Sequence, residues 1–310
     1  MEKIEILRIE SLSRAPLVVE GYLFKGTNPK APKVAIVGAM EGDSILPLYC
    51  ASTMVDFFKN KIEKEKIKGD VLIIPSINHY ALNIGKRFWP LDNTDINMMF
   101  PGYELGETTQ RIAKKVFDAI SGYDYGIILE RRPDPATCLP YIKLYKSGYE
   151  DLKSAKKFGF KMIHHRNMKS IDTVTLQYNW QLWGTKAFSI MCPSDNQVDK
   201  KIASQINQAM IRFMDKTKIV DYHIFNGYES TVIDRNSIDV VKSPRSGIFI
   251  SKELPGNYVS KDQVIGEIVH SLEGEVIHQF LAPCNGMITC FYSNSLIYEH
   301  AVAFRIAKIG

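Results

Sequence analysis

The stretch FWPLDNTDINMMFPG, residues 88–102, has the composition of an ordered loop rather than that of a helix or a strand. Its two acidic residues, its two Asn residues and its terminal Pro-Gly favour turns, because Asp and Asn bond their own backbone while Pro and Gly interrupt regular elements. Phe88, Trp89 and Phe100 supply large apolar side chains that would hold such a loop against a core. A polar loop held in this way is typical of a binding or catalytic segment.

Strand-like and helix-like segments alternate on both sides of this loop, which predicts an α/β domain with a largely parallel or mixed sheet covered on both faces. Short apolar runs that predict buried strands cover residues 33–38, 71–74, 125–129, 161–164 and 187–191. Segments with apolar residues at three- and four-residue spacing, which predict helices, cover residues 44–58, 108–120, 149–158, 176–182 and 198–214. Ligands bind such sheets beyond the carboxyl ends of the strands, so we expect the functional loops at residues 38–43, 75–102, 130–140 and 191–197.

Both ends of the chain carry the period-2 pattern of antiparallel strands. Residues 4–9 and 17–24 predict an N-terminal β hairpin. After about residue 220 only short alternating runs punctuated by Gly, Pro and Asn remain, which predicts an all-β module. We therefore divide the chain into an α/β domain, residues 1–220, and a C-terminal β domain, residues 221–310. A helix of three or more turns within residues 245–310 would contradict this division.

The overall composition excludes several classes of protein. The 310 residues are 45% hydrophobic and 24% charged with a net charge of +5, which is typical of a soluble globular chain. No basic block interleaved with aromatics indicates a nucleic-acid partner, and no apolar run reaches the roughly 18 residues of a membrane span. The N-terminus has no secretory apolar region, and the five scattered cysteines have the pattern of free thiols, so we expect a cytoplasmic location.

Together with its flanking segments, the loop resembles the motif D-G-x-D-L-N-R-x-F-P-G of the succinylglutamate desuccinylase/aspartoacylase branch of the zinc carboxypeptidases. The matching residues are Asp92, Asp95, Asn97, Phe100, Pro101 and Gly102. The resemblance implies a zinc-carboxypeptidase-like mixed sheet flanked by helices, followed by a barrel-sandwich-like β domain. Residues 246–249, 256–266 and 282–288 resemble that β domain, which is related to lipoyl carriers. No hairpin tip here has a carrier lysine, so we expect the β domain to be a structural cap.

At the positions that align with the family's zinc ligands, this sequence has residues of other types. The family motif G-x-H-G-x-E aligns with residues 38–43, which puts Met40 at the His position and Asp43 at the Glu position. The family's second His aligns with Glu130, and its general base, a Glu at the end of a strand, aligns with Met191. A thioether is a poor zinc ligand in a nitrogen and oxygen site. We therefore predict a degenerate zinc site, with zinc absent or replaced by another divalent cation.

The residues that hold the substrate's carboxylate in the family are partly kept. Arg87 aligns with an arginine that binds the carboxylate, and Asn97 aligns with its Asn partner, whereas Met98 replaces the second arginine. The anion-binding half of the cleft is thus expected to survive better than the catalytic half.

Each of these residues also has a purely structural interpretation. Met40 and Met191 fit a strand-end core, and Asp43 fits the N-cap or first turn of the following helix. Glu130 precedes Arg131 and Arg132, so it could form an ion pair or lie at a solvated strand end. Arg87 could form a structural ion pair with Asp92 or Asp95. His164 and His165 suggest a metal site, but neighbouring residues on a strand point to opposite faces and seldom chelate one ion.

The function implied by the resemblance is zinc-dependent hydrolysis of an amide bond next to a carboxylate, and the substitutions predict that it is reduced or lost. One alternative is a protein that binds a small carboxylated metabolite or a peptide end. Another is a hydrolase that holds Mg²⁺ or Mn²⁺ through Glu41 or Asp43 together with Glu130. The sequence also leaves open a non-catalytic subunit of an active homologue and a homo-oligomer.

Overall fold

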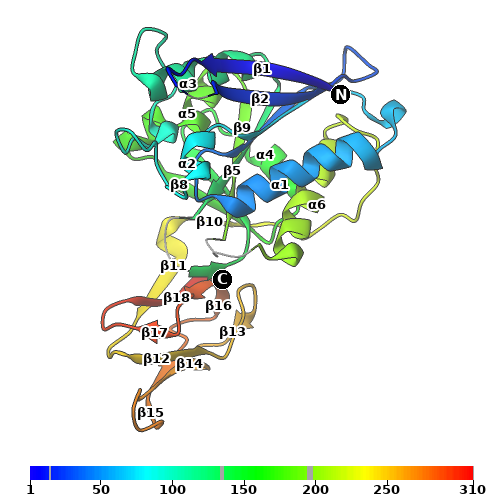
Figure 1. Ribbon diagram of the computed structural model, residues 1–310. Helices are drawn as coiled ribbons and strands as arrows, with labels where there is room; N and C mark the ends of the chain where they lie inside the picture. The colour runs from blue at the N-terminus through cyan, green and yellow to red at the C-terminus, as the bar shows by residue number, and fades with distance from the viewer. Residues whose placement is uncertain (14, 133–135, 194–197, 310) are drawn as a thin grey trace. The chain divides into compact units, whose positions relative to one another are not determined.

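The computed structural model describes residues 1–13, 15–132, 136–193 and 198–309 (Figure 1). The chain divides into two compact units. Unit 1 comprises Met1–Arg131, Tyr141–Cys192 and Asn196–Ser230, and unit 2 comprises Arg132–Pro140, Pro193–Asp195 and Thr231–Gly310. The C-terminal part of unit 2 therefore begins about ten residues after the predicted division at residue 220. Unit 2 also includes two short segments from the first part of the chain, Arg132–Pro140 and Pro193–Asp195. Residues 133–135 and 194–197, which belong to the expected functional loops, lie outside the described residues.

Unit 1 contains a mixed sheet in the order β1-β2-β4-β3-β5-β9-β7-β8. Its strands are β1 (Glu2–Ile9), β2 (Leu17–Phe24), β3 (Val34–Ala39), β4 (Val71–Ser76), β5 (Tyr125–Arg131), β7 (Tyr141–Lys146), β8 (Met162–Asn167) and β9 (Lys186–Cys192). Strands β4, β3, β5 and β9 are parallel, whereas the hairpin β1–β2 is antiparallel and joins β4 antiparallel. Strand β7 is antiparallel to β9 and parallel to β8. The mixed α/β fold and the N-terminal hairpin are therefore confirmed.

Helices cover both faces of this sheet. They are α1 (Ile45–Asp56), α2 (His79–Asn83), α3 (Thr108–Ile120), α4 (Leu152–Ala155), α5 (Leu176–Leu182) and α6 (Lys200–Lys216). Shorter turns are η1 (Phe57–Lys61), η2 (Lys64–Lys66), η3 (Ile96–Met98), η4 (Lys156–Phe158) and η5 (Ser170–Val174). Figure 1 shows α1 beside α6, and Asn207 of α6 donates a 2.6 Å hydrogen bond to Thr53 of α1.

The core of unit 1 has two clusters, one on each face of the sheet, because side chains along a strand alternate between the two faces. In β3, Val34 and Ile36 belong to a cluster formed with α1 and α6, whereas Ala35 and Val37 belong to a second cluster formed with α3, α5 and the hairpin. Alternate residues of a strand point to opposite faces, so a strand with helices on both sides must be apolar at every position. This explains why the apolar runs of the sequence predict the central strands well.

Two features predicted for the first 160 residues are wrong in detail. The helix expected at residues 149–158 is only the single turn α4 followed by η4, because Gly159 takes the left-handed conformation and ends it. The expected loop at 130–140 contains β6 (Ala136–Cys138) and leads into β7, a strand that the sequence analysis did not predict. Strand β7 mixes buried and charged residues in YIKLYK, so it lacks a continuous apolar run.

Unit 2 contains two antiparallel sheets. One has the order β11-β18-β16-β13 with β6 paired to β16, and the other has the order β15-β14-β12-β17. The elements assigned to unit 2 are β6, β10 (Thr231–Ile233), η6 (Arg235–Ser237), β11 (Ile238–Lys242), β12 (Gly247–Ser251), β13 (Tyr258–Val259), β14 (Val264–Val269), β15 (Val276–Leu281), β16 (Gly286–Tyr292), β17 (Leu296–Ile297) and β18 (Val302–Lys308). Phe249, Phe280 and Phe304 pack edge to face at its centre. The described part of residues 245–310 contains no helix.

The parallel strands of unit 1 end at one edge of the sheet, where their loops meet. The loop after β3 packs closely on the segment after α2, and a Cβ on Gly42 would lie 2.3 Å from the Lys86 carbonyl oxygen. Gly42 N–H donates to the Arg87 carbonyl oxygen at 2.9 Å, which fixes this approach. No helix in the described ranges is long and apolar enough to span a membrane.

Candidate functional site

A small cavity of about 30 Å³ lies where the loops after β3 and β5 meet the loop 88–102. Its walls are Met40, Glu41, Ser44, Asn97, Leu129, Glu130 and Arg131. A space of this size holds about one water molecule or one carboxylate oxygen. The structure thus brings Met40, Asn97 and Glu130, which are distant in the sequence, to one place.

Met40 is only 4% exposed and belongs to the core cluster that includes α3 and α5. This placement agrees with the structural interpretation of Met40. Met191 is also buried, at the end of β9 and opposite Glu130 in the parallel register. Neither methionine offers the nitrogen or oxygen atom that the aligned family position supplies.

Asp43 is not the N-cap of α1, because Ser44 takes that position. Instead, Asp43 Oδ2 lies 3.3 Å from Arg131 Nη1 at the end of β5, and the two side chains are 33% and 17% exposed. Since both loops emerge from neighbouring parallel strands, β3 and β5, the ion pair ties them together at the cavity edge.

Arg87 pairs with Glu41 rather than with Asp92 or Asp95. Its Nη2 lies 2.8 Å from Glu41 Oε1, and its guanidinium carbon lies 4.9 Å from the centre of the Phe88 ring. The two aspartates instead accept hydrogen bonds from nearby backbone N–H groups within the loop. Burial raises the pKa of Glu41 in spite of the opposing effect of Arg87.

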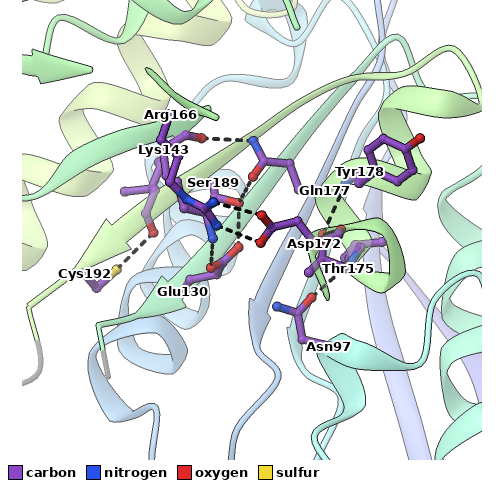
Figure 2. Close-up of polar contacts among 12 residues, drawn as sticks. Asn97, Glu130, Lys143, Arg166, Asp172, Thr175, Gln177, Tyr178, Ser189 and Cys192 are labelled. Carbon is purple, nitrogen blue, oxygen red and sulfur yellow. Dashed lines mark hydrogen bonds and ion pairs between the residues drawn. The ribbon is translucent and has the colours of Figure 1, made fainter. Parts of the chain in front are cut away.

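Glu130 is held in a buried polar network (Figure 2). One carboxylate oxygen forms a short contact with Lys143 Nζ, and the other accepts a 2.6 Å hydrogen bond from the Ser189 hydroxyl. The Ser189 oxygen also lies 3.0 Å from Gln177 Oε1, while Gln177 Nε2 donates to the Lys143 carbonyl oxygen at 2.9 Å. Of the alternatives for Glu130, the ion pair is therefore the one observed, with Lys143 rather than Arg131 or Arg132 as partner.

Glu130 and Tyr145 raise the pKa of Lys143, although burial by itself would lower that pKa. The raised pKa means that Lys143 keeps its positive charge throughout the neutral range. The Lys143 ammonium lies 5.2 Å from the centre of the Tyr145 ring, and the Arg166 guanidinium lies 4.6 Å from the same ring. Arg166 in turn forms a two-bonded pair with Asp172 at 2.7 and 2.8 Å.

Asn97 lies in η3 and faces this network from the loop (Figure 2). Its Oδ1 accepts a 3.2 Å hydrogen bond from the Leu176 N–H at the start of α5. The side-chain carbonyl is therefore used within the fold, which leaves the amide N–H₂ as its donor group. Met98, at the end of the same turn, does not line the cavity.

Two buried polar atoms beside the cavity have no hydrogen-bond partner among the described residues. They are Arg87 Nε, which is a donor, and Asp43 Oδ1, which is an acceptor. Buried polar atoms are nearly always bonded, so atoms of this kind require an explanation such as a water, an ion or a ligand.

His164 and His165 do not form a metal site. His165 Nε2 lies 3.0 Å from Glu150 Oε1, whereas His164 packs beside the Tyr141 ring. Among the described residues, the metal-type cluster whose ligand atoms lie within 4.8 Å of one another is Asp215, Asp221 and His223. It contains neither Asp43 nor Glu130.

Sequence analysis missed the residues that surround Glu130, namely Lys143, Ser189 and Gln177. Lys143 lies on strand β7, which was not predicted. Ser189 lies within the predicted apolar strand β9, but it was not predicted to be a site residue. The alternation of YIKLYK, with Ile142 and Leu144 on one face, was the available signal for a strand that places Lys143 on the other face.

Comparison with known proteins identifies relatives of this fold. Residues 30–129 match the family model described as the succinylglutamate desuccinylase/aspartoacylase catalytic domain. The N-alpha-acetyl-L-2,4-diaminobutyric acid deacetylase of Halomonas elongata is 29% identical over 111 residues, which cover 36% of this chain and 30% of the relative. The match thus spans less than a third of that relative's length.

Solved structures resemble the chain over nearly its whole length. A succinylglutamate desuccinylase/aspartoacylase from Rhodobacter sphaeroides has a TM-score of 0.72 at 17% identity and covers 98% of this chain and 94% of its own. The product-bound ectoine utilization protein EutE (DoeB) from Ruegeria pomeroyi has a TM-score of 0.73 at 15% identity, with the same coverage. At these identities the likeness concerns the fold alone.

The ion pair between Glu130 and Lys143 yields a stability prediction. Lys143→Met leaves the carboxylate buried without its counter-charge, so we expect the free energy of unfolding in urea to fall by about 3–5 kcal/mol. Lys114→Met is the matched control, because its exposed pair with Asp118 should contribute about 0.5 kcal/mol. The double variant Lys143→Met/Glu130→Gln should recover part of the loss. Equal losses for Lys143→Met and Lys114→Met would show that the buried pair has no special role.

Proposed function

Because this chain belongs to the succinylglutamate desuccinylase/aspartoacylase family, we propose that it keeps the carboxylate-binding part of the family's cleft and has lost zinc-dependent hydrolysis. The observation that carries the proposal is that the chain's own cations neutralise the carboxylates at the family's ligand positions. Arg131 pairs with Asp43, and Lys143 pairs with Glu130.

The residues at these positions do not fit zinc. A zinc ion between Asp43 and Glu130 would have to displace Lys143, a charged and buried lysine that has no other acidic partner at this distance in the described network. The remaining position offers the buried thioether of Met40, which is a poor ligand beside hard oxygen donors. Met191 supplies no basic atom where the family has its Glu. We therefore assign no zinc-dependent step to this chain.

Two residues that contact the cavity wall, Arg87 beside Glu41 and Asp43 beside Arg131, have features that suit a carboxylate ligand. Arg87 uses Nη2 for Glu41 and keeps Nε–H without a partner in the described structure, so it can donate to a ligand oxygen. The Arg87 side chain as a whole is 34% exposed although its Nε is buried, so a ligand from solvent meets the guanidinium first and reaches Nε once that side chain shifts. Asp43 Oδ1 is the complementary acceptor, suited to an N–H of the ligand. A molecule with a carboxylate and a neighbouring N–H group carries the acceptor and the donor that these two atoms lack.

This pairing favours N-acyl amino acids and peptide ends among small carboxylated ligands. The Halomonas relative is named for an N-acetylated amino acid, which contains both groups. The family resemblance therefore supports the same ligand class that the unsatisfied atoms indicate. Here we propose binding of such a molecule without cleavage.

A hydrolase that holds Mg²⁺ or Mn²⁺ is the second candidate. Glu41 and Glu130 line one cavity, and the charges of Asp43 and Asp95 contribute to the raised pKa of Glu41, so oxygen donors are numerous. In the described structure, however, three carboxylates of this set do not bring their oxygens within 4.8 Å of one another. Metal analysis of protein purified without chelators or a metal-binding tag separates the two candidates, since one bound equivalent favours the hydrolase.

The carboxylate proposal makes Arg87 the residue to change. Arg87→Ala should weaken binding of N-acetyl amino acids by about 2 kcal/mol, because a charge-assisted hydrogen bond is lost. Isothermal titration with a panel of N-acyl amino acids and dipeptides measures this. The neighbouring exposed Lys86→Ala is the matched control and should bind as the wild type does. If Arg87→Ala binds the panel equally well, Arg87 has only a structural role.

The raised pKa of Glu41 predicts how binding depends on pH. Deprotonated Glu41 competes with the ligand for Arg87, and protonation removes this competitor. Affinity for a carboxylate should therefore rise as the pH falls from about 7 towards the pKa of Glu41, since the ligand's own carboxylate stays ionised down to about pH 4. Glu41→Gln should bind more tightly at neutral pH and lose most of the pH dependence. An affinity that falls with decreasing pH would contradict the competition between Glu41 and the ligand.

The loss of hydrolysis predicts no turnover of N-acyl amino acids or peptides above buffer, with or without added Zn²⁺. The combined reversion Met40→His, Asp43→Glu, Glu130→His and Met191→Glu should restore zinc binding more readily than activity. Activity also requires the missing arginine and a supporting shell, which here is built around Lys143. Amide hydrolysis by the wild-type protein that depends on Mg²⁺ or Mn²⁺ and disappears in Glu130→Ala would instead establish the second candidate.

A further inference from the structure

Two buried cysteines of unit 2 face each other across neighbouring strands. Cys138 on β6 and Cys290 on β16 are direct partners in the antiparallel register, and they are 4% and 2% exposed. Directly opposite residues of an antiparallel pair have Cα atoms about 4.5–5.5 Å apart, within the range of about 4.4–6.8 Å that a disulfide spans. The two thiols also share one buried cluster, so both side chains lie on the same face.

One of these thiols borders a cavity. The cavity has a volume of about 230 Å³, large enough for a small molecule, and is open to solvent. Its lining includes Cys290 together with the apolar residues Ala136, Phe291, Tyr292, Val302 and Ala303. The charged lining residues are Arg132 and Arg305. A small polar reagent that enters this cavity thus comes up against the residue Cys290.

The charges of Arg132 and Arg305 act to lower the pKa of both thiols of the pair. The hydrogen bond with Cys138 lowers the pKa of Cys290, and the charges of Arg132 and Arg305 act in the same direction against the effect of burial. The pKa of Cys138, on the other side of the same hydrogen bond, is raised. In Cys50, by contrast, burial alone raises the pKa to about 12. Because Cys290 lines the cavity and Cys138 does not, we assign to Cys290 the role of the reactive sulfur, which acts as the thiolate.

We propose that Cys290 and Cys138 form a redox-active dithiol that reacts with small hydroperoxides entering the cavity beside Arg132 and Arg305. The site lies wholly within unit 2 and uses none of the residues of the proposed carboxylate site. Its product is a disulfide that joins β6 covalently to β16.

The reaction has two balanced steps. The Cys290 thiolate attacks the terminal peroxide oxygen, the O–O bond breaks, and the departing alkoxide or hydroxide takes up a proton as alcohol or water, which leaves Cys290 as the sulfenic acid. The Cys138 sulfur then attacks the Cys290 sulfur, and the thiol proton of Cys138 leaves with the hydroxyl group as water. The two electrons reduce the peroxide, and an external dithiol returns them to the protein. Positive charge from the two arginines favours the thiolate and the departing oxygen anion alike.

The test uses the reduced full-length protein with hydrogen peroxide and a chelator. We expect the intact mass to fall by two hydrogens, the other three of the five cysteines to remain alkylatable, and peptide mapping to recover a Cys138–Cys290 linked peptide. An external dithiol should reverse the change. Cys284 is the internal control, because it is more accessible than the pair but burial raises the pKa of its thiol. First oxidation at Cys284, or thiol loss without the linked peptide, would overturn the proposal.

Variants assign the two sulfurs. In Cys138→Ser the reaction should stop at a sulfenic acid on Cys290 that dimedone traps, whereas Cys290→Ser should leave Cys138 unoxidised. The matched variant Cys284→Ser should form the linked peptide as the wild type does. The rate of Cys290 oxidation should reach its plateau at a lower pH than that of an ordinary thiol, whose pKa is about 8.5. A rate that still rises above that pH would show that Cys290 is an inert core thiol, whatever the behaviour of the variants.

Discussion

Glu130 on β5 and Lys143 on β7 are stable inside unit 1 only because each neutralises the other. A single buried charge is strongly unfavourable, whereas a well-bonded pair is tolerated. The rest of the cleft is arranged around this pair. Ser189 donates to Glu130, Gln177 lies against Ser189 and holds the β7 backbone, and Tyr145 lies between Lys143 and Arg166. Removal of either charge would disturb every later contact in this series.

The pair also restricts the chemistry of the cleft. A divalent metal and a lysine ammonium cannot occupy the same carboxylate without strong repulsion. Lys143 neutralises Glu130 in an ion pair within the fold, and Arg131 neutralises Asp43 in another. The ion pair of Arg87 with Glu41 is easier to break, because Arg87 is more exposed and the pKa of Glu41 is raised. This difference between fixed and exchangeable ion pairs is the physical basis for proposing binding without hydrolysis.

The two proposed sites rely on charge in different ways. In unit 1, the charged side chains of the cleft pair with one another in ion pairs. The Nε–H group of Arg87 is the donor that we propose for a ligand. In unit 2, Arg132 and Arg305 border a mostly apolar cavity, where their charge favours a thiolate. Two strands that follow β5 supply partners described above, β7 with Lys143 for Glu130 and β6 with Cys138 for Cys290. The sequence analysis predicted neither of these two strands.

The sequence by itself determined the α/β class, the N-terminal hairpin, the central strands and the loop 88–102, because strands buried on both faces are apolar throughout and turns need particular residues. Through a resemblance to a family motif it also predicted Met40, Asp43, Glu130, Arg87 and Asn97 as site residues. Only the tertiary structure decided their partners. Lys143 meets Glu130, Arg131 meets Asp43 and Cys138 meets Cys290 through strand order and register, and these depend on long-range packing that no local pattern of residues encodes.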